Sequence, residues 1–343
     1  MGVFKEEDEK MNGPACTILV AAYDAEKYIT KSLDSLVNQT LKDIEVIVID
    51  DCSSDNTLSI IREYAAEYPM IKYIKLDKNQ GQAHARNEGL KIARGRYITF
   101  LDSDDWLSAD ALKEAVDTFE ANPLTDCVLF HVINYYDSHH HESYQMPEFE
   151  MMSGREAFEK SLSWIIHGVY MVKADIHKKI PYDETCRSYS DDNTTRIHYL
   201  MSREVRQCKG VYYYRQHDAS TTHKIDISRY DYLKANVHMK EMLVNMKEDE
   251  YILNRYENER WLNVIGLYMF YFQHRRKFSK KENKYGMSEI KKAWKSIEPQ
   301  RLSWKNRLKF GYVPMHFSFL WPIFRIQEEI YFGLKRILGR IGS

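Results

Sequence analysis

The stretch Tyr97-Ile-Thr-Phe-Leu-Asp-Ser-Asp-Asp105 joins a short apolar run directly to three carboxylates. An apolar run of this length, rich in aromatic and β-branched side chains, predicts a strand that is buried on both faces. In a parallel sheet, the residues that follow a strand lie at the carboxyl edge, where ligands bind. The stretch therefore predicts an α/β fold and marks a candidate site.

Strands and helices alternate around this stretch. Gly81 is expected to open a helix that runs to about Arg94, and Gly95 fits as its C-terminal cap. Short connections between alternating elements predict a doubly wound, mostly parallel sheet covered by helices on both faces. The predicted strands lie at 17–22, 45–50, 71–76, 97–101, 126–134 and 211–215.

Composition excludes several classes of protein. The formal net charge of the 343 residues is -1, so no overall basic field recruits nucleic acid. The five cysteines form no CxxC pair, which disfavours a disulfide framework or a zinc knuckle and favours a reducing compartment. Residues 1–15 are polar and acidic, which predicts a disordered tail. They contain no apolar stretch of the kind found in a secretory signal sequence. No apolar run approaches the roughly 20 residues that a bilayer span requires, so a cytoplasmic protein is expected.

The acidic turn is a candidate cation site. Asp102 and Asp104 alternate on a tight turn and can face one hard cation. Mg²⁺ or Mn²⁺ held by one or two carboxylates keeps positions open for phosphate oxygens. The alternative is that these residues form an acidic turn ahead of the next helix, which Ser108 and Asp110 continue.

Three further polar residues follow the other strands or lie near a helix start. Tyr23 can stack on a nucleobase, and Asp51 can accept a hydrogen bond from a ring N–H such as that of uracil. Arg86 can reach a diphosphate. The alternatives are a core aromatic for Tyr23, a helix N-cap for Asp51 and a surface ion pair for Arg86. The tract His139-His140-His141 is expected to be a solvated loop.

Five ordered motifs together resemble glycosyltransferase family 2, whose members are inverting enzymes of GT-A fold. The resemblance is strong from about residue 16 to 108 and weaker to about 222. The motifs are Thr-Ile-Leu-Val-Ala-Ala-Tyr-Asp-Ala-Glu-Lys-Tyr (17–28), Ser-Leu-Val-Asn-Gln-Thr (35–40), Val-Ile-Asp-Asp-Cys-Ser-Ser-Asp-Asn-Thr (48–57), Ala-Arg-Asn-Glu-Gly-Leu (85–90) and Ala-Arg-Gly-Arg-Tyr-Ile-Thr-Phe-Leu-Asp-Ser-Asp-Asp (93–105).

The resemblance implies roles in donor binding. Tyr23 and Asp51 resemble the uridine-binding pair, and Arg86 resembles an arginine near the donor phosphates. Asp102 and Asp104 resemble the DxD motif, with Ser103 between them, and Asp104 is implied as the direct ligand of Mn²⁺ or Mg²⁺.

Later segments of the chain supply the remaining implied roles. Asp191-Asp192 stands where the family usually has Glu-Asp, so Asp192 is implied as the general base, with its neighbour Asp191 as the other candidate. Arg215, His217 and Ser220 resemble a loop that closes over the diphosphate. The chain departs from the family pattern at three further positions, which are Ala21, Asp24 and Cys52.

The resemblance implies an inverting hexosyl or N-acetylhexosaminyl transferase. A UDP-sugar is the expected donor and a saccharide or lipid-linked saccharide the expected acceptor, in polysaccharide biosynthesis. The alternative is a non-catalytic sugar-nucleotide-binding or scaffold protein on the same fold. We expect a GT-A catalytic domain at 16–224, with a nucleotide-sugar half at 16–108 and an acceptor half at 109–224, and a helical C-terminal region at 225–343.

The C-terminal region contains an amphipathic pattern. Arg325, Lys335, Arg336 and Arg340 lie off an apolar stripe that recurs at helical spacing, formed by Ile323, Ile326, Ile330, Leu334, Ile337 and Ile341. Such a helix can lie on an anionic membrane, and the aromatic run 317–321 adds anchors, so a peripheral location at the inner face of the cell membrane is expected. The alternatives are packing on the enzyme's own core or on a second subunit, which leaves homo-oligomer formation open.

The run Glu257-Asn-Glu-Arg260-Trp261 is a near match to the QxxRW element of processive polysaccharide synthases. It lacks the glutamine and has no predicted membrane span beside it. We therefore expect a helix surface with a buried tryptophan at this position.

Overall fold

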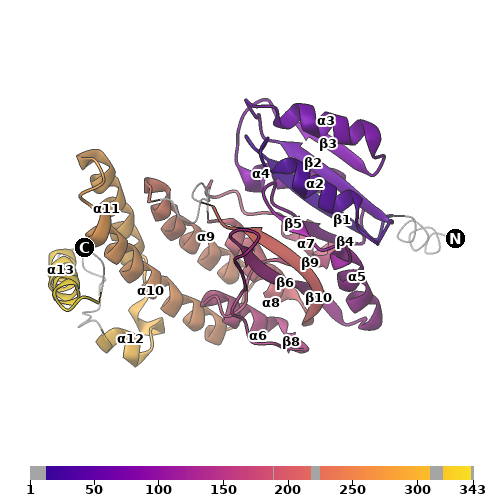
Figure 1. Cartoon of the computed structure of the whole chain (residues 1–343). Coiled ribbons are helices and arrows are strands. Elements are labelled where there is room, and N and C mark those ends of the chain that lie inside the picture. Colours follow the sequence, from indigo (N-terminus) through magenta and orange to yellow (C-terminus); the bar gives the residue numbers. More distant parts are fainter. Residues whose placement is uncertain (1–12, 188, 218–224, 310–319, 341–343) are drawn as a thin grey trace. The chain divides into compact units, whose positions relative to one another are not determined.

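The computed structural model describes residues 13–187, 189–217, 225–309 and 320–340 (Figure 1). They form two compact units. The first unit contains the described residues up to 187 together with 194–217, and the second contains 189–193 together with the residues from 225 onward. The catalytic domain expected at 16–224 includes residues 189–193, whereas the structure groups these residues with the second unit.

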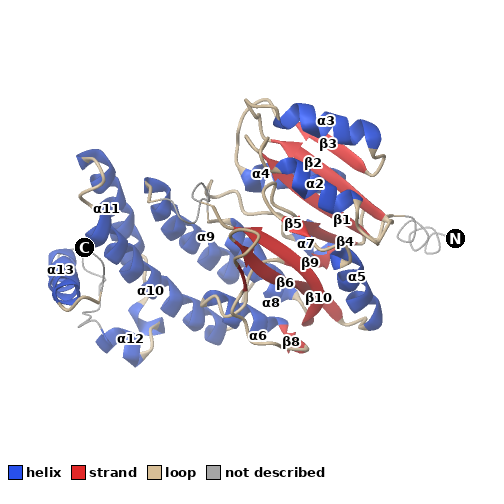
Figure 2. Cartoon of the chain, viewed as in Figure 1, coloured by secondary structure: helices blue, strands red, loops and turns tan. Residues whose placement is uncertain are grey.

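A mixed sheet forms the centre of the first unit (Figure 2). Strands β1 to β4 and the pair β6–β10 run parallel, and the short β9 lies antiparallel between β4 and β6. The order along the sheet is β3-β2-β1-β4-β9-β6-β10-β5. The strands are β1 Cys16–Ala22, β2 Ile44–Asp50, β3 Ile71–Lys75, β4 Tyr97–Phe100, β5 Trp106–Leu107, β6 Thr125–Tyr135, β7 His141–Ser143, β8 Met151–Ser153, β9 Tyr170–Lys173 and β10 Glu204–Arg215.

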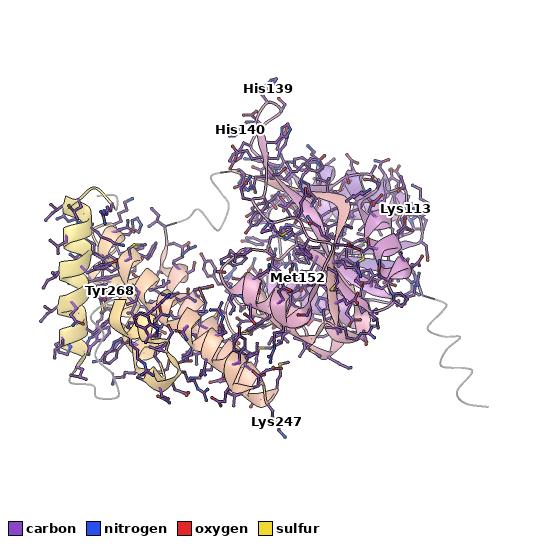
Figure 3. The ribbon with its side chains drawn as sticks, turned by 90° about the horizontal axis from the view of Figure 1, so that it is seen from below. Lys113, His139, His140, Met152, Lys247 and Tyr268 are labelled. Carbon is purple, nitrogen blue, oxygen red and sulfur yellow. The ribbon has the colours of Figure 1, made fainter. Side chains whose placement is uncertain are left out.

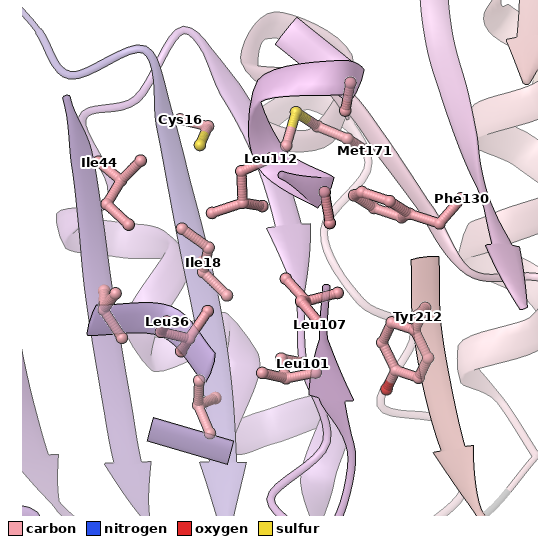
Figure 4. Close-up of a cluster of buried hydrophobic side chains, with 14 of the residues drawn as sticks. Cys16, Ile18, Leu36, Ile44, Leu101, Leu107, Leu112, Phe130, Met171 and Tyr212 are labelled. Carbon is pink, nitrogen blue, oxygen red and sulfur yellow. The ribbon is translucent and has the colours of Figure 1, made fainter. Parts of the chain in front are cut away.

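Helices cover this sheet, and the predicted mostly parallel α/β fold is confirmed. Ile18 and Val46 of the parallel strands pack with Leu33 of α2 and Leu112 of α5 in one buried cluster, part of which is drawn in Figure 4. The helices are α2 Ile29–Val37, α3 Thr57–Glu67, α4 Gln82–Ile92, α5 Ala111–Ala121, α6 Gly154–Leu162, α7 Ala174–Lys179 and α8 Asp191–Met201. The Ser153 hydroxyl caps α6 by accepting from the backbone N–H of Glu156.

Several details differ from the sequence-based expectation. β5, β7, β8 and β9 were not predicted, because strands of two to four residues carry too few side chains to show a period. α4 ends at Ile92 with Ala93 as its C-cap, so Gly95 is not the cap. A Cβ on Gly95 would lie 2.3 Å from the backbone nitrogen of Thr17, so this glycine permits close approach of β1.

The tail prediction is wrong for residues 13–15. The Pro14 carbonyl accepts from the backbone N–H of Arg96, and the Ala15 carbonyl accepts from that of Tyr97. These bonds attach residues 14 and 15 to the start of β4. Residues 1–12 lie outside the described part of the chain.

The histidine tract lies at the tip of the β6–β7 hairpin. His139 and His140 project from the first unit in Figure 3. A carboxylate lies beside the tract, since His140 Nε2 is 3.1 Å from Glu142 Oε1. The His140 ring also stacks on Tyr136, and the loop is exposed, as predicted.

The second unit is helical in its described residues. Tyr268 and Trp294 lie in its aromatic core, and Figure 3 labels the first of these. Its helices are η2 Ile227–Tyr230, α9 Asp231–Asn245, α10 Glu250–His274, α11 Lys280–Lys295, η3 Pro299–Arg301, α12 Trp304–Lys309 and α13 Trp321–Ile337. No helix in the described ranges has the length and apolarity that crossing a bilayer would require.

The near match to QxxRW is buried in the second unit. Trp261 is buried as predicted, but Glu257 and Arg260 are buried as well, so the expected helix surface is wrong there. Glu257 Oε2 lies 2.8 Å from Arg260 Nη1 and 3.0 Å from Lys240 Nζ. Burial of these charges is tolerated because each is paired. The segment therefore has a structural role in the second unit.

Candidate active site

The acidic turn after β4 is connected to the end of β10. Asp105 is fully buried, and its Oδ2 accepts from the Tyr212 hydroxyl at 2.7 Å while its Oδ1 accepts from the backbone N–H of Arg215 at 2.8 Å. The same hydroxyl accepts from the backbone N–H of Asp102 at 3.2 Å. Burial raises the pKa of Asp105 well above its usual range, and the charges of Asp102 and Asp104 add to this effect. The buried Asp105–Tyr212 pair therefore attaches the acidic turn to the end of β10.

Asp102 is oriented by groups from α4. Its Oδ1 accepts from Arg86 Nη2 and, at 2.6 Å, from Gln82 Nε2. Arg86 is buried, with its guanidinium 4.1 Å from the Phe100 ring centroid. The alternative of a surface ion pair is therefore wrong for Arg86. The structure pairs this arginine with Asp102, and the predicted contact to a diphosphate stays a prediction.

Asp104 lies beside the cationic end of β10. His217 Nε2 is 2.9 Å from Asp104 Oδ2, and Arg215 Nε donates to the Asp104 carbonyl at 2.8 Å. The His217 ring stacks on Tyr28, and the Arg215 guanidinium lies 4.8 Å from the Trp106 ring centroid. The Tyr28 ring restricts His217, and the Trp106 ring restricts Arg215. The turn therefore combines an accessible carboxylate with an imidazole and a guanidinium.

Asp51 shapes a pocket at the ends of β2 and β3. Its Oδ1 accepts from the backbone N–H of Gln80 at 2.9 Å and its Oδ2 from that of Gly81 at 2.8 Å, so it is not a helix N-cap. Gly81 has φ +95°, and a Cβ there would lie 3.2 Å from Arg187 Cγ. The pocket has a volume of about 180 Å³ and is lined by Asn79, Gln80, Gly81, Ala83, His84, Glu184, Cys186 and Arg187.

Tyr23 lies at the carboxyl edge with its side chain half exposed, at 50%. This exposure excludes the alternative of a core aromatic and leaves the ring available for stacking. The loop behind it is constrained, because Asp24 Oδ1 accepts from the backbone N–H of Ser54 at 2.7 Å. The nucleobase contact itself stays a prediction.

The remaining predicted site residues lie in the acidic turn, in α8 or outside the described part of the chain. Ser103 lies between the two DxD carboxylates in the same turn. Asp191 and Asp192 lie in the first turn of α8, where the helix dipole favours carboxylates. Both are partly exposed, and neither is favoured as the base by its position in the helix. Ser220 lies outside the described residues.

Sequence reasoning missed Asp105 and Tyr212 as parts of the site. Asp105 was visible as a third carboxylate in the acidic turn, but the sequence did not indicate its burial. Tyr212 is 107 residues away from it, and only the pairing of β10 with β5 brings the two together. Gln82 was also missed, since its position one residue after Gly81 gave no signal of a contact with Asp102.

Replacing Tyr212 with phenylalanine should test this connection. The change leaves the buried Asp105 carboxylate without one donor and the Asp102 N–H without its acceptor, which should destabilise the protein by about 1–3 kcal/mol. Thermal unfolding measures this loss. Tyr213→Phe is the matched control, because the Tyr213 ring stacks on Trp106 and the change keeps that ring. Equal unfolding temperatures for the two variants would contradict the connection.

Cys52 occupies a strained backbone position. Its φ is +65°, in the left-handed region that costs an L-residue about 1–2 kcal/mol. Cys52→Gly removes this strain at an entropic cost of about 0.5–1 kcal/mol, so the melting temperature should rise by about 2 °C. Asp24→Gly is the control, since Asp24 also has a positive φ but holds Ser54. Stabilisation of both variants, or of neither, would show that strain at Cys52 is not the cause.

The fold and the site define a class of protein. An α/β sheet with an acidic turn, a histidine and an arginine at its carboxyl edge, next to the pocket that Asp51 shapes, is suited to a phosphate-bearing ligand. A family model described as "Glycosyl transferase family 2" matches residues 17–180. Residues 17–180 of the chain therefore form a glycosyltransferase family 2 domain.

Individual relatives agree with this assignment. The chain is 40% identical to a chondroitin synthase from Escherichia coli over 115 residues, which are 34% of this chain and 17% of that protein. A crystal structure of S. aureus TarS in complex with UDP-GlcNAc is 20% identical, with a TM-score of 0.66 over 83% of this chain and 82% of that chain. This likeness shows a common fold, and it confirms the predicted GT-A class.

A second solved structure has the same general fold. It is a mannosyltransferase from Pyrobaculum calidifontis in complex with GDP-Man and Mn²⁺, 16% identical, with a TM-score of 0.53 over 97% of this chain and 89% of that chain. Against eight curated relatives, the chain spans less than two thirds of each relative's own length, from 16% to 63%.

Proposed function

We propose that this chain transfers a hexosyl or N-acetylhexosaminyl group from a nucleotide-diphosphate sugar, with UDP as the nucleotide, to a saccharide hydroxyl, with inversion. One observation carries the proposal. Gln80 and Gly81 line the pocket, and the next residue, Gln82, donates to Asp102 of the acidic turn. A nucleoside in the pocket would therefore place its diphosphate toward Asp104, Arg215 and His217. UDP-GlcNAc in the complex of TarS, which shares the fold, supports a nucleotide-sugar ligand.

The residues of the turn fit a divalent cation. A carboxylate and an imidazole 2.9 Å apart have the spacing of neighbouring ligands on one octahedral ion, which is about 3 Å for bonds of about 2.1 Å. Within the described ranges no group of three or more His, Cys, Asp or Glu side chains is arranged so that it could hold a metal ion. Two protein ligands leave positions for phosphate oxygens, as Mn²⁺ or Mg²⁺ requires.

In this proposal, Asp104 and His217 hold the ion, and Asp102 orients the turn through Arg86. When bound, the ion supplies Lewis-acid stabilisation of the leaving diphosphate. The Arg215 guanidinium, restricted by Trp106, adds a fixed positive charge for the same oxygens.

Deprotonation of the acceptor is assigned to the Asp191–Asp192 pair, with Asp192 as the base. A hydroxyl is a poor nucleophile at neutral pH, and a carboxylate within hydrogen-bond reach removes its proton as attack proceeds. Attack from the face opposite the leaving diphosphate inverts the anomeric centre. The acceptor is proposed to be a saccharide or a lipid-linked saccharide in polysaccharide biosynthesis, with the chain at the inner face of the cell membrane.

A panel of nucleotide sugars tests the proposal against its alternative, a non-catalytic binder or scaffold. The correct donor at about 100 times its Kd should stabilise the protein by about 2.7 kcal/mol, a rise in melting temperature of several degrees. Slow hydrolysis of that donor without acceptor should follow, with Mn²⁺ or Mg²⁺ present. Stabilisation without any hydrolysis or transfer would favour the binder, and no stabilisation by any nucleotide sugar would refute both.

A further inference from the structure

Helix α13 docks through an aromatic face. Trp321, Phe324 and Phe332 are buried in the core of the second unit. The Trp321 ring lies 5.3 Å from that of Trp294 in α11, and the Phe324 ring lies 5.6 Å from that of Tyr268 in α10. The helix is therefore held by this face, and its opposite face is available to a partner.

The opposite face of α13 is apolar. Its residues, 45–81% exposed, are the described part of the stripe noted in the sequence, namely Ile323, Ile326, Ile330, Leu334 and Ile337. Ile341 lies outside the described residues. The interpretation that the stripe packs on the chain's own core is wrong for these five residues, because the aromatic face of α13 is the one that packs on the core.

The charges of α13 lie beside this stripe and not on it. Glu328 is buried, and Arg325, Glu329, Lys335 and Arg336 are each partly buried. Lys335 Nζ lies 4.7 Å from the Tyr331 ring centroid, and Arg336 lies over Phe272. A helix on a water-exposed surface usually shows the reverse pattern, with polar residues outward. A continuous exposed apolar face marks an interaction site.

The charge of the surrounding region indicates the kind of partner. Residues 225–343 contain 23 Lys or Arg and 13 Asp or Glu, a formal net charge of +10, whereas residues 1–224 contain 26 and 37, a net charge of -11. Five exposed cations cluster where α10 ends and α11 begins, namely Arg276, Lys277, Lys280, Lys281 and Lys284. A region with this positive net charge is attracted to an anionic surface.

We propose that the apolar stripe of α13 inserts into the interface of an anionic bilayer, and that the basic residues of the second unit contact lipid headgroups. An apolar face with cationic neighbours is the composition of interfacial helices. A second copy of the chain fits less well, because it would bring another region of charge +10 against the first. The inference rests on the proposed membrane location and not on the proposed reaction, since lipid binding requires no donor.

Vesicle co-sedimentation tests the proposal with the full chain. Vesicles of phosphatidylcholine alone are compared with vesicles that contain one third phosphatidylglycerol, at low and at high salt. The test variant is Ile326→Gln with Ile330→Gln, both at positions 59% exposed. Its matched control is Val244→Gln with Met151→Gln, at exposed apolar positions elsewhere in the chain, 51% and 47% exposed. Circular dichroism confirms that each variant is folded.

The expected result is that the full chain and the control bind the anionic vesicles, that binding weakens at high salt, and that the stripe variant binds at least tenfold more weakly. A full chain that stays in the supernatant with both lipids would overturn the proposal, as would equal binding by the stripe variant. Light scattering measures the oligomeric state without lipid. A dimer of the full chain that the stripe variant does not form would also overturn the proposal. A donor assay on the same samples keeps failure of the reaction separate from failure of lipid binding.

Discussion

Asp192→Asn is expected to lower the rate of sugar transfer by about 10²–10⁴-fold, because the amide keeps the shape of the side chain and removes the base. Donor binding should remain, since the base acts on the acceptor. A single-turnover assay with saturating acceptor measures the rate, and the donor-induced rise in melting temperature measures binding.

Asp191→Asn is a closely matched control. Both aspartates lie in the first turn of α8, so each substitution removes a similar helix-dipole interaction of about 0.3–1 kcal/mol. Equal losses of stability leave the difference in rate as the readout. An inactive Asp191 variant beside an active Asp192 variant would reverse the assignment, and two fully active variants would remove both residues from catalysis.

Asp104→Ala is expected to reduce transfer by at least about 10²-fold, and EDTA should have a similar effect on the unmodified chain, because several kcal/mol of charge stabilisation are lost with the ion. Titration of activity with Mn²⁺ is the measurement. His217→Gln should raise the Mn²⁺ concentration required for half of the maximal rate, since one proposed ligand is weakened.

Asp117→Ala is the control for this experiment, because it removes an exposed carboxylate of α5 that pairs with Lys113. Asp102→Ala is a poorer probe of metal binding. It removes the carboxylate next to the buried Arg86 guanidinium and should itself destabilise the fold. Full activity of the Asp104 variant, or of the unmodified chain in EDTA, would refute the metal proposal.

The buried parallel strands were predictable because each one carries a continuous apolar run. The runs at 17–22 and 45–50 differ from β1 and β2 by one residue at their starts. The strand at 211–215 was predicted seven residues too short, since β10 begins at Glu204 with polar and apolar residues mixed. β9 has four residues and separates β4 from β6, which no local pattern indicates.

Part of the site could be located from the sequence because residues after parallel strands share one edge. Asp104, Arg215 and His217 were all identified, and the structure brings them together. The immediate partners of Arg86 and Asp51 were not predictable, because they depend on which buried donors and acceptors meet after packing. Arg86 contacts Asp102, and Asp51 holds the backbone of Gln80 and Gly81.

By itself the sequence determined the fold class, the acidic turn and the apolar periodicity of α13, because each depends on local order along the chain. Only the tertiary structure decided which face of α13 is buried. The same holds for which carboxylate of the acidic turn is buried. Phe324 and Ile326 are both apolar and two residues apart, yet packing against α10 and α11 buries the first and exposes the second. Asp104 and Asp105 are adjacent and chemically identical, and the contact of Asp105 with Tyr212 separates their roles. Burial depends on what approaches from elsewhere in the chain, and the local sequence does not contain that information.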